Sequence, residues 1–581
     1  MTTVSNIKVI DARNYSKESR QTFSQDSSVI AIIKSNELWA EWSRSIDPEL
    51  SPSQITEEIN ELAKSHRVEF ELALEELACT KSVYWRATRT AEKNTLINPL
   101  YENVILASLV LQHNFQHTSR ILITDNPFLL SFFNNQNIFE KIKKYSLFKT
   151  KYSRRNLKNL FLFLIWFIGN FIVARQIPQK DTQILIHTFV DEESRKSQVY
   201  KERYFPSLSD WYEKNDLSVS YLLSGAGNYP LGLFNAMNAN GHNVFNEFKL
   251  YKLKDLVFVV LTASKLRSAR INSFIVRNIE LKKLVSLIHS EFGIDLDVYK
   301  HILRSKFGQR LGNASNPPYV LLTEFEGMIP EKMLNLGISR SNSKIKTFGF
   351  QHGAMFEHLL CNYPTSSELR LGLVSDKVIS NGSIFKDLMI SRGLPCDRVV
   401  TGSALRYRYL HESIKTESPL EQKDLLVLLP MTIPDCLDLI RIVQEGVSNL
   451  NTTVHFKPHP FNDISFLSQQ IDLSRHTIVD NMLGNLIFDY KVIAGMTTGA
   501  LLEAGLLGLN VIKIQRQLSI DFDTTFLNPE LRIQVRDSEE FRSALIGLQE
   551  NRSSIIQRDH KNLIDGYFAP ISLAGMAAFL P

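Results

Sequence analysis

The sequence predicts an α/β protein made of two doubly wound, Rossmann-like domains that face each other, preceded by a mostly helical region. The chain has 581 residues, which is too many for a single hydrophobic core. From Asp181 onward, short apolar runs alternate with helical segments. These runs are continuous rather than alternately polar and apolar, as expected for parallel strands that are covered by helices on both faces.

Residues 1–118 are predicted to be mostly helical. The segment Ser51–Glu58 places a polar capping residue before acidic residues, which is typical of a helix start, and an amphipathic stretch continues to about Ala78. The first clear buried strand begins at Arg120 and ends in a turn at Pro127. We therefore expect the first Rossmann-like domain to span residues 119–360.

Positive charge is concentrated in residues 141–180. This segment holds ten lysines and arginines and no acidic residue, so with a total net charge of +5 the rest of the chain carries −5. A general nucleic-acid binder would not confine its basic residues to one segment beside an apolar run, so nucleic acid is not an expected partner.

The apolar run Leu160–Ala174 follows these basic residues. Fifteen helical residues extend about 22 Å, which is short of the roughly 30 Å hydrocarbon core of a membrane. The run is therefore predicted to be an interfacial helix or a buried core helix, and its cationic flank favours the interface with anionic lipid. The N-terminus has no secretory signal pattern. We expect a cytoplasmic protein that is peripheral on the inner membrane through residues 141–180.

Two series of strands are predicted, separated by a linker at residues 361–375. The first series comprises Gln183–Val190, Ser218–Ser224, Val257–Thr262, Tyr319–Thr323 and Lys346–Gln351. The second, in a domain spanning 376–581, comprises Lys377–Ser380, Val399–Gly402, Leu425–Leu429, Thr453–Lys457, Thr477–Asp480, Lys491–Ala494 and Val511–Ile514, followed by a helix at Ser538–Asn551. The final apolar tail is expected to pack back across the cleft between the domains.

The turn Lys457-Pro458-His459-Pro460 closes one of these strands. The two prolines fix the backbone direction around His459. Lys457 and His459 stand two residues apart on an extended segment, so both side chains point to the same side and can meet one anion. Phosphate suits a lysine charge and imidazole N–H donors. A histidine that merely caps the strand end is the alternative.

The loop Gly495–Ala500 separates another strand from an apolar helix. Thr497, Thr498 and Gly499 place hydroxyl and backbone N–H groups at the positive end of that helix, where anions bind. Glu503 lies one turn further, where its carboxylate can accept hydrogen bonds from a ribose diol. Thr497 can also be a simple helix cap. No dinucleotide or Walker A glycine motif is present, which argues against NAD-linked redox chemistry and P-loop hydrolysis.

Candidate catalytic groups follow two strands of the first series. Gln351 and His352 end one strand, and Glu324 and Glu326 end the preceding one. A carboxylate and a histidine at this edge are suited to deprotonating a hydroxyl group. Glu324 and Glu326 share strand parity; Glu326 is favoured because the glycine after it suggests a close approach to substrate. A solvated ion pair is the alternative role.

Ser403 and Arg406 follow the second strand of the second series and are predicted to help hold a phosphate or diphosphate. The four cysteines match no metal-site spacing, and no metal or other cofactor is expected.

These motifs resemble those of bacterial surface-polysaccharide glycosyltransferases of the GT-B fold, including capsule-type, Kdo and sialic acid transferases and the related teichoic-acid polyol-phosphate transferases. The resemblance covers roughly residues 182–514. It depends on Gln351–Gly353, Ser403 with Arg406, Lys457–Pro460 and Thr497–Glu503. It implies a first domain on the acceptor side and a second domain that binds the nucleotide donor.

In sialyltransferases of this kind a His-Pro motif binds the CMP phosphate, and His459-Pro460 matches it. An acidic pair before a glycine supplies the base; Glu324-Phe325-Glu326-Gly327 departs from that pattern by the inserted Phe325. The resemblance implies transfer of a sugar from a nucleotide sugar, possibly CMP-linked, to a glycan or lipid-linked glycan without a metal. Three alternatives remain at this point: a CDP-glycerol-type polyol-phosphate transferase, a nucleotide-sugar epimerase of related fold, and a non-catalytic scaffold.

Overall fold

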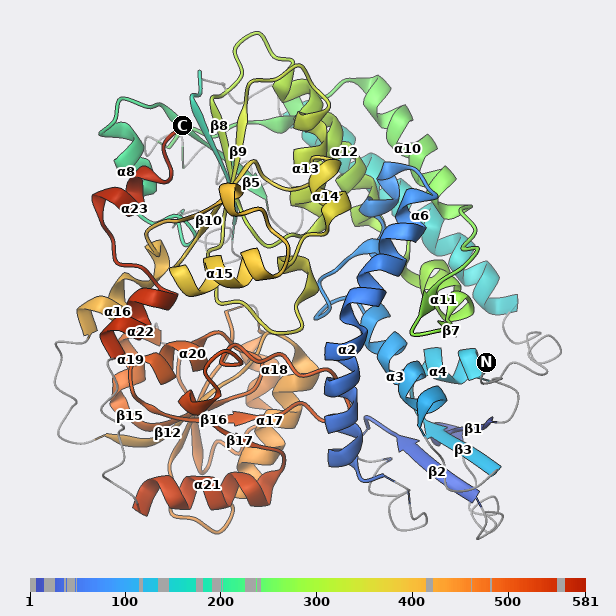
Figure 1. The fold of residues 1–581 in the computed structure, drawn as a ribbon, viewed down its shortest axis with the longest axis vertical. Coiled ribbons are helices and arrows are strands. Elements are labelled where there is room, and N and C mark those ends of the chain that lie inside the picture. Colours follow the sequence, from blue (N-terminus) through green and yellow to red (C-terminus); the bar gives the residue numbers. More distant parts are fainter. Residues whose placement is uncertain are drawn as a thin grey trace.

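The computed structural model consists of two α/β lobes and an N-terminal region that lies against both (Figure 1). It describes residues 7–14, 27–35, 50–113, 119–133, 146–173, 181–190, 202–224, 242–413, 422–460, 462–480, 483–550 and 560–581, with the isolated residues 38, 48, 200 and 237.

The first lobe is built on a six-stranded, all-parallel sheet in the order β11-β10-β9-β8-β4-β5. One face of the sheet packs against the helices α12 and α13, and the other against α8 and the C-terminal tail. Both faces are apolar, as predicted for covered parallel strands. The strands are β4 (Ile184–Phe189), β5 (Val219–Ser224), β8 (Val320–Glu324), β9 (Lys346–Phe350), β10 (Lys377–Ser380) and β11 (Val399–Thr401); the helices are α8 (Leu208–Glu213), α12 (Leu296–Gly312) and α13 (Ile329–Ser339).

The second lobe repeats this architecture with the order β14-β13-β12-β15-β16-β17, again all parallel. Successive residues of β12 point to different clusters, since Leu425 and Val427 belong to one core and Leu426 and Leu428 to another. The predicted class of two doubly wound domains is confirmed. The elements are β12 (Lys423–Leu428), β13 (Val454–Lys457), β14 (His476–Ile478), β15 (Tyr490–Gly495), β16 (Asn510–Ile514), β17 (Ile533–Val535), α17 (Ile433–Gly446), α20 (Ala500–Leu506) and α21 (Ser538–Glu550).

Two strands expected in the second series belong to the first sheet. β10 pairs with β9 through Lys377 and Phe348, and β11 pairs with β10 through Val378 and Val399. The segment 361–375, which contains the short helix α14 (Ser366–Arg370), therefore lies within the first lobe, and the first strand of the second sheet is β12. A strand pattern identifies a buried strand but not its neighbours, which is why the sequence placed these two strands wrongly.

The C-terminal tail returns to the first lobe, as expected. It forms α22 (His560–Tyr567) and α23 (Leu573–Ala577), and α23 lies beside α8 (Figure 1). The hydroxyl of Tyr212 donates to the carbonyl of Phe579 at 2.8 Å, and the Phe579 ring lies 5.2 Å from that of Phe350.

The N-terminal region contains strands that the sequence analysis missed. β1 (Ile7–Asp11), β3 (Ser119–Thr124) and β2 (Ser27–Ile32) form a separate three-stranded parallel sheet in that order. The predicted strand at Arg120 exists, but it joins this small sheet and not the first Rossmann-like sheet. The helices α2 (Pro52–Cys79), α3 (Leu100–Gln112) and α4 (Pro127–Phe133) complete the region.

The predicted strand Val257–Thr262 is wrong, because these residues lie inside the helix α10 (Leu253–Arg267). The helix buries Val259, Ala263 and Leu266 and exposes Val257 and other apolar residues on its opposite side. Apolar residues on both sides of a helix give the continuous apolar run that resembles a buried strand.

Helix α2 belongs to the N-terminal region and runs alongside both lobes (Figure 1). It begins with the predicted capping box: Gln54 N–H donates to the Ser51 hydroxyl at 3.3 Å, and Ser51 N–H donates to Gln54 Oε1 at 2.9 Å. Near its start, Leu518 N–H donates to the Thr56 hydroxyl at 2.9 Å. Near its end, Ser367 N–H donates to Glu75 Oε1 at 3.2 Å.

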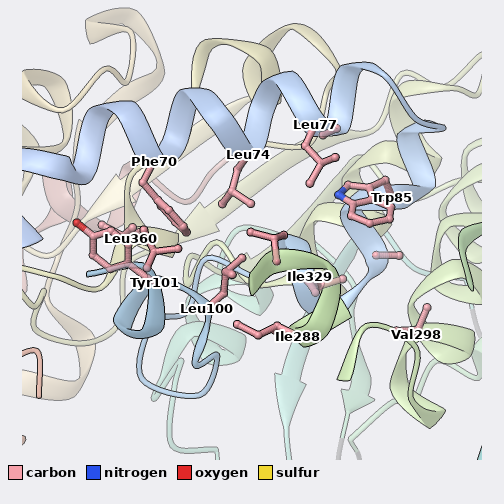
Figure 2. Packing of buried hydrophobic residues seen from close by; sticks show 14 of the residues in the cluster. Phe70, Leu74, Leu77, Trp85, Leu100, Tyr101, Ile288, Val298, Ile329 and Leu360 are labelled. Carbon is pink, nitrogen blue, oxygen red and sulfur yellow. The ribbon is translucent and has the colours of Figure 1, made fainter. Parts of the chain in front are cut away.

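The buried face of α2 packs into the largest core cluster, shown in Figure 2. Phe70 lies 4.5 Å from the ring of Tyr101 and 5.9 Å from that of Phe274, so it joins α2 to α3 and to the loop after α10. Leu74 and Leu77 continue the same face by one and two turns.

We expect Phe70→Ala to lower the free energy of unfolding by about 3–5 kcal/mol, because it removes a large buried ring and leaves a cavity. Urea unfolding followed by circular dichroism measures this loss. Leu72→Ala is the matched control, since Leu72 lies on the exposed side of the same helix and should change stability by less than about 0.5 kcal/mol. Equal effects of the two substitutions would contradict the packing described here.

Candidate active site

A cavity of about 340 Å³ lies between the two lobes. This volume falls within the range of small-molecule sites. The first lobe lines it with residues that follow β8, β9 and β11, and the second with residues that follow β15, so carboxyl ends of strands from both sheets face the same space. Its lining residues are Asn94, Phe325, Glu326, Met328, Gln351, His352, Gly353, Ala354, Met355, Phe356, Leu359, Cys361, Asn362, Arg406, Tyr407, Thr498, Gly499, Ala500 and Glu503.

The turn after β8 positions Glu326 at the cavity. Glu331, in the first turn of α13, accepts hydrogen bonds from the backbone N–H of Glu326 at 3.2 Å and of Gly327 at 2.8 Å. Gly327 has a φ of +60°, and a Cβ there would lie 1.8 Å from the carbonyl oxygen of Cys361. The glycine therefore permits a close approach of the chain to itself, whereas the sequence analysis had interpreted it as an approach to substrate.

Glu326, His352 and Arg406 form a linear hydrogen-bonded chain. His352 Nε2 lies 2.9 Å from Glu326 Oε1, and Arg406 Nη1 lies 2.7 Å from His352 Nδ1. A guanidinium can only donate, so Nδ1 must accept, and the remaining proton of a neutral imidazole must reside on Nε2 and point to Glu326. The ring edge also meets Tyr204, with centroids 4.9 Å apart. His352 is thus held as a donor that orients the carboxylate.

The electrostatic surroundings keep Glu326 ionised. Burial by itself would raise its pKa, but the hydrogen bond from His352 and the positive charge of Arg406 outweigh burial, so the pKa lies below the ordinary value. The carboxylate is also accessible, because its side chain is 37% exposed. An ionised, oriented and accessible carboxylate is equipped to accept a proton.

Glu324 differs from Glu326 in each of these respects. Its side chain is 1% exposed, lies outside the cavity lining, and has Oε2 at 3.2 Å from His187 Nδ1. Burial raises the pKa of Glu324 well above its ordinary value and lowers that of His187 well below its own. Burial therefore disfavours the charged form of both groups, and the structure distinguishes Glu324 from Glu326, which their two-residue spacing left equivalent.

The second lobe contributes Thr498, Gly499 and Glu503. Glu503 lies one turn into α20, which has only seven residues, and its carboxylate accepts a hydrogen bond from the hydroxyl of Tyr409. Burial raises the pKa of Glu503 above the ordinary value, although the Tyr409 hydrogen bond and the Arg406 charge oppose that rise. The lobes approach closely here, since a Cβ on Gly499 would lie 3.5 Å from that of Ala354.

Lys457 and His459 lie on the same edge of the second sheet but do not line the cavity. Strand β13 is separated from β15 by β12, which places the two strand ends about 10 Å apart. Both side chains are partly exposed, and Pro460 after them is exposed. Burial, followed by the charge of Lys457, lowers the pKa of His459 to about 4, so its imidazole is neutral at pH 7.

Ser403, Thr497 and Gln351 were also predicted to bind the ligand. The first two do not line the cavity, and Gln351 has a structural hydrogen bond there. Ser403 is fully buried beneath the C-terminal tail, where its hydroxyl accepts from Ser572 N–H at 3.2 Å. That contact follows from β11 belonging to the first lobe. Thr497 is buried behind the loop and is not part of the lining. Gln351 lines the cavity, but its Oε1 accepts from Asn381 N–H at 3.0 Å, so it joins β9 to β10.

The sequence analysis missed several residues of the site. Asn94 reaches the cavity from the N-terminal region, and no local pattern marks it. Glu331 accepts a hydrogen bond from the backbone N–H of Glu326, and Tyr409 donates one to the carboxylate of Glu503. Glu331 carried a usable signal, because a proline followed by an acid marks a helix start directly after a strand end. Burial raises the pKa of Glu331 to about 8.

Within the described ranges, no group of three or more histidine, cysteine or acidic side chains is arranged to hold a metal ion. The polar side-chain groups that line the cavity are two carboxylates, one imidazole, one guanidinium, hydroxyls, amides and the thiol of Cys361.

We expect His352→Phe to move the acidic limb of the pH–rate profile to higher pH. The substitution keeps a ring against Tyr204 but removes the hydrogen bond that lowers the pKa of Glu326, so burial acts with less opposition. A carboxylate can accept a proton only when it is deprotonated, so any activity that depends on Glu326 should then be lost at a higher pH as the solution is acidified. His411→Phe, outside the cavity, should leave the limb in place; an unmoved limb in His352→Phe would contradict the coupling.

No protein family model matches the chain, and no curated protein matches it. Similar solved structures include UDP-GlcNAc 2-epimerase from Neisseria meningitidis bound to UDP-GlcNAc, with 11% identity, a TM-score of 0.38, and coverage of 68% of this chain and 97% of that chain. A glycosyltransferase from Rickettsia africae ESF-5 has 11% identity, a TM-score of 0.36, and coverage of 68% and 96%. The calicheamicin glycosyltransferase CalG4 has 12% identity, a TM-score of 0.36, and coverage of 67% and 96%.

Proposed function

We propose that the protein is a glycosyltransferase that moves a sugar from a nucleotide-sugar donor to a hydroxyl group of a glycan or lipid-linked glycan. The observation that carries this proposal is the placement of an ionised, His352-oriented Glu326 across one cavity from the Thr498–Glu503 segment. A base on one lobe and hydroxyl, amide and carboxylate groups on the other suit an acceptor and a donor that meet between them.

Glu326 is the proposed general base. Its carboxylate takes the proton of the acceptor hydroxyl while that oxygen forms a bond to the anomeric carbon. The bond between this carbon and the donor phosphate oxygen breaks, and its electron pair leaves with the nucleotide. His352 keeps the carboxylate oriented through the hydrogen bond from Nε2 and does not itself gain a proton, because Nδ1 accepts from Arg406.

Arg406 is the proposed partner of the departing phosphate. Among the residues that line the cavity, Arg406 carries the permanent positive charge. It is hydrogen-bonded to His352, and its charge also acts on Glu503. A fixed positive charge aimed at the oxygen where negative charge develops lowers the barrier more than it stabilises the bound donor. The hydroxyl and backbone N–H of Thr498 and Gly499 are the proposed additional donors to the phosphates.

Glu503 is the proposed ligand of the donor ribose, since a carboxylate can accept from both hydroxyls of a diol. Lys457 and His459 are proposed to hold a more distant phosphate or the nucleotide end of the donor. They share the sheet edge with Glu503, and a nucleotide is long enough to bridge the separation of about 10 Å between the two strand ends.

The resemblance to surface-polysaccharide transferases supports a CMP-linked donor and an acceptor used in capsule or lipopolysaccharide synthesis. We propose that the protein works without a metal at the cytoplasmic face of a bacterial inner membrane, as a peripheral protein that uses residues 141–180. Residues 134–145 and 174–180 of this neighbourhood lie outside the described residues, whereas the helix α6 (Ser146–Val173) lies within them.

The second candidate function is a nucleotide-sugar epimerase, since a base in the same cavity could act on the donor itself. Incubating the purified protein with a donor and no acceptor distinguishes the two: a transferase leaves the sugar configuration unchanged, and an epimerase produces its isomer. A polyol-phosphate transferase would instead break the phosphorus–oxygen bond, so isotopic labelling of the bridging oxygen separates it from sugar transfer.

A thermal-shift screen with CMP, CDP, UDP, GDP and dTDP should find a nucleotide that raises the melting temperature. A ligand at a hundredfold excess over its Kd stabilises the native state by about 2.7 kcal/mol. Glu503→Ala should weaken that nucleotide about tenfold or more, because it removes a charged hydrogen-bond acceptor. Glu445→Ala, at an exposed carboxylate of the same lobe, should not. A chain that responds to none of the five nucleotides would overturn the proposal.

Glu326→Gln should reduce kcat at least a hundredfold while the nucleotide still raises the melting temperature, because it removes the base without removing donor ligands. Glu324→Gln is the matched control. Burial disfavours the charged form of Glu324, so an uncharged amide of the same shape should preserve most of the activity. The reverse pattern would assign the base to Glu324.

A further inference from the structure

Two helices of the first lobe each expose a stripe of large apolar side chains. On α6 the exposed residues recur at helical spacing; they are Leu157, Phe161, Ile165, Ile168 and Ile172, with Leu162 beside them. On α10 they are Leu253, Val257 and Leu261, four residues apart. Leu157 and Leu253 are each 66% exposed, and single exposed residues are ordinary on a protein surface, but two ordered stripes are not.

The opposite faces of both helices are fixed to the same buried helix. Phe163 and Phe167 of α6 are fully buried, and the Phe163 ring lies 5.3 Å from that of Tyr299 on α12. On α10, Asp255 is paired with Arg310 of α12 at 2.6 Å. Every residue of α12 is buried or partly buried. The two helices therefore lie on the outer flank of the first lobe (Figure 1), with their apolar stripes turned away from α12.

The charges around these stripes are positive. Lys158 of α6 is exposed, and Lys149, Lys151, Arg154 and Arg155 occupy the preceding turns of the helix. On α10, Lys254 and Lys265 are exposed, and the one acidic residue of the helix is the buried, paired Asp255. Lys265 continues the spacing of Leu253, Val257 and Leu261, so it stands at the end of that stripe.

We propose that α6 and α10 form one lipid-binding face that seats the first lobe on an anionic bilayer. Apolar side chains next to lysine and arginine match the boundary between acyl chains and anionic headgroups. Two copies of this face would bring like charges together, which disfavours a second copy of the chain as its occupant. Among the described residues no helix combines the length and apolarity needed to cross a membrane, so both helices would lie along its surface.

The lipid-binding face extends the membrane contact of the proposed function. It rests on that function in one respect, because a lipid-linked acceptor would be reached from the bilayer on which the face lies. It adds α10, which carries no basic run in the sequence and was predicted to be a strand. It also makes binding a property of two helices anchored on α12 rather than of the segment 141–180 alone.

The test is sedimentation of the full chain with vesicles of phosphatidylcholine alone or with 30% phosphatidylglycerol. We expect binding to the anionic vesicles that weakens as salt is raised. Phe161→Ser combined with Ile165→Ser should weaken binding at least tenfold, and Val257→Ser combined with Leu261→Ser should also weaken it about tenfold, because each pair loses buried apolar surface. Leu473→Ser combined with Leu573→Ser, at exposed sites elsewhere, should leave binding unchanged.

The outcomes separate this inference from the catalytic one. Loss of binding in the α6 pair alone would restrict the face to α6 and overturn the two-helix proposal. Unchanged binding in both pairs, or absence of binding by the unmodified chain, would overturn it entirely. A self-association in solution that both pairs abolish would assign the face to a second copy. In every case the nucleotide thermal shift, measured on the same variants, reports separately on the catalytic cavity and on folding.

Discussion

Helix α2 sets the relation between the two lobes on which the cavity depends. Its first turns contact the second lobe: Asp521 N–H donates to Asn60 Oδ1 at 2.9 Å, and Arg536 pairs with Glu57 at 3.1 Å. Its later turns contact the first lobe, where Arg277 N–H donates to Glu69 Oε2 at 2.7 Å. A rotation of one lobe against the other would have to break one set of contacts, and each hydrogen bond contributes about 1 kcal/mol.

Other parts of the chain act in the same direction. Lys93, in the N-terminal region, is buried and donates to the carbonyl of Tyr363 at 2.6 Å and to Glu368 at 3.2 Å. A direct backbone hydrogen bond also crosses between the lobes, from Glu357 N–H to the carbonyl of Asp523 at 3.2 Å. Removing either buried partner would leave the other unsatisfied, so these contacts resist separation more than exposed ones. A ligand of the cavity would then enter a largely preformed site.

Much of the fold could be predicted because it depends on local pattern. Continuous apolar runs identified the strands that carry Glu326 and His352, and the rule that ligands bind at carboxyl ends of parallel strands brought these residues together with Thr498 and Glu503. The rule failed at Ser403, because it requires knowledge of which sheet a strand joins. That information is nonlocal: β11 pairs with β10, and the tail that covers Ser403 arrives about 170 residues later in the chain.

The remaining errors also arise from contacts that the sequence does not display. Asn94 faces the cavity only because the N-terminal region docks there. The choice between Glu324 and Glu326 could not be made by parity, since it depends on burial and on the donors that each carboxylate meets. The helix α10 was mistaken for a strand because its exposed side is apolar. That error has a physical cause that matters for function, since a surface helix ordinarily has a polar outer face.

The first lobe carries positive charge in two separate places, at the cavity and on its outer flank. At the cavity, Arg406 is exposed, and its guanidinium is held by the hydrogen bond from Nη1 to His352 Nδ1, so its charge has a fixed position but remains open to solvent. Outside, the exposed Lys158 of α6 and Lys254 and Lys265 of α10 stand beside the apolar stripes in water, where salt screens them. In the proposed function, the same kind of side chain binds a nucleotide phosphate at the cavity and lipid phosphates on the outer flank, so the two tasks fall to separate surfaces. Salt screens both sets, since Arg406 and the flank lysines are all exposed; what distinguishes the cavity cation is its fixed position, because His352 holds its guanidinium.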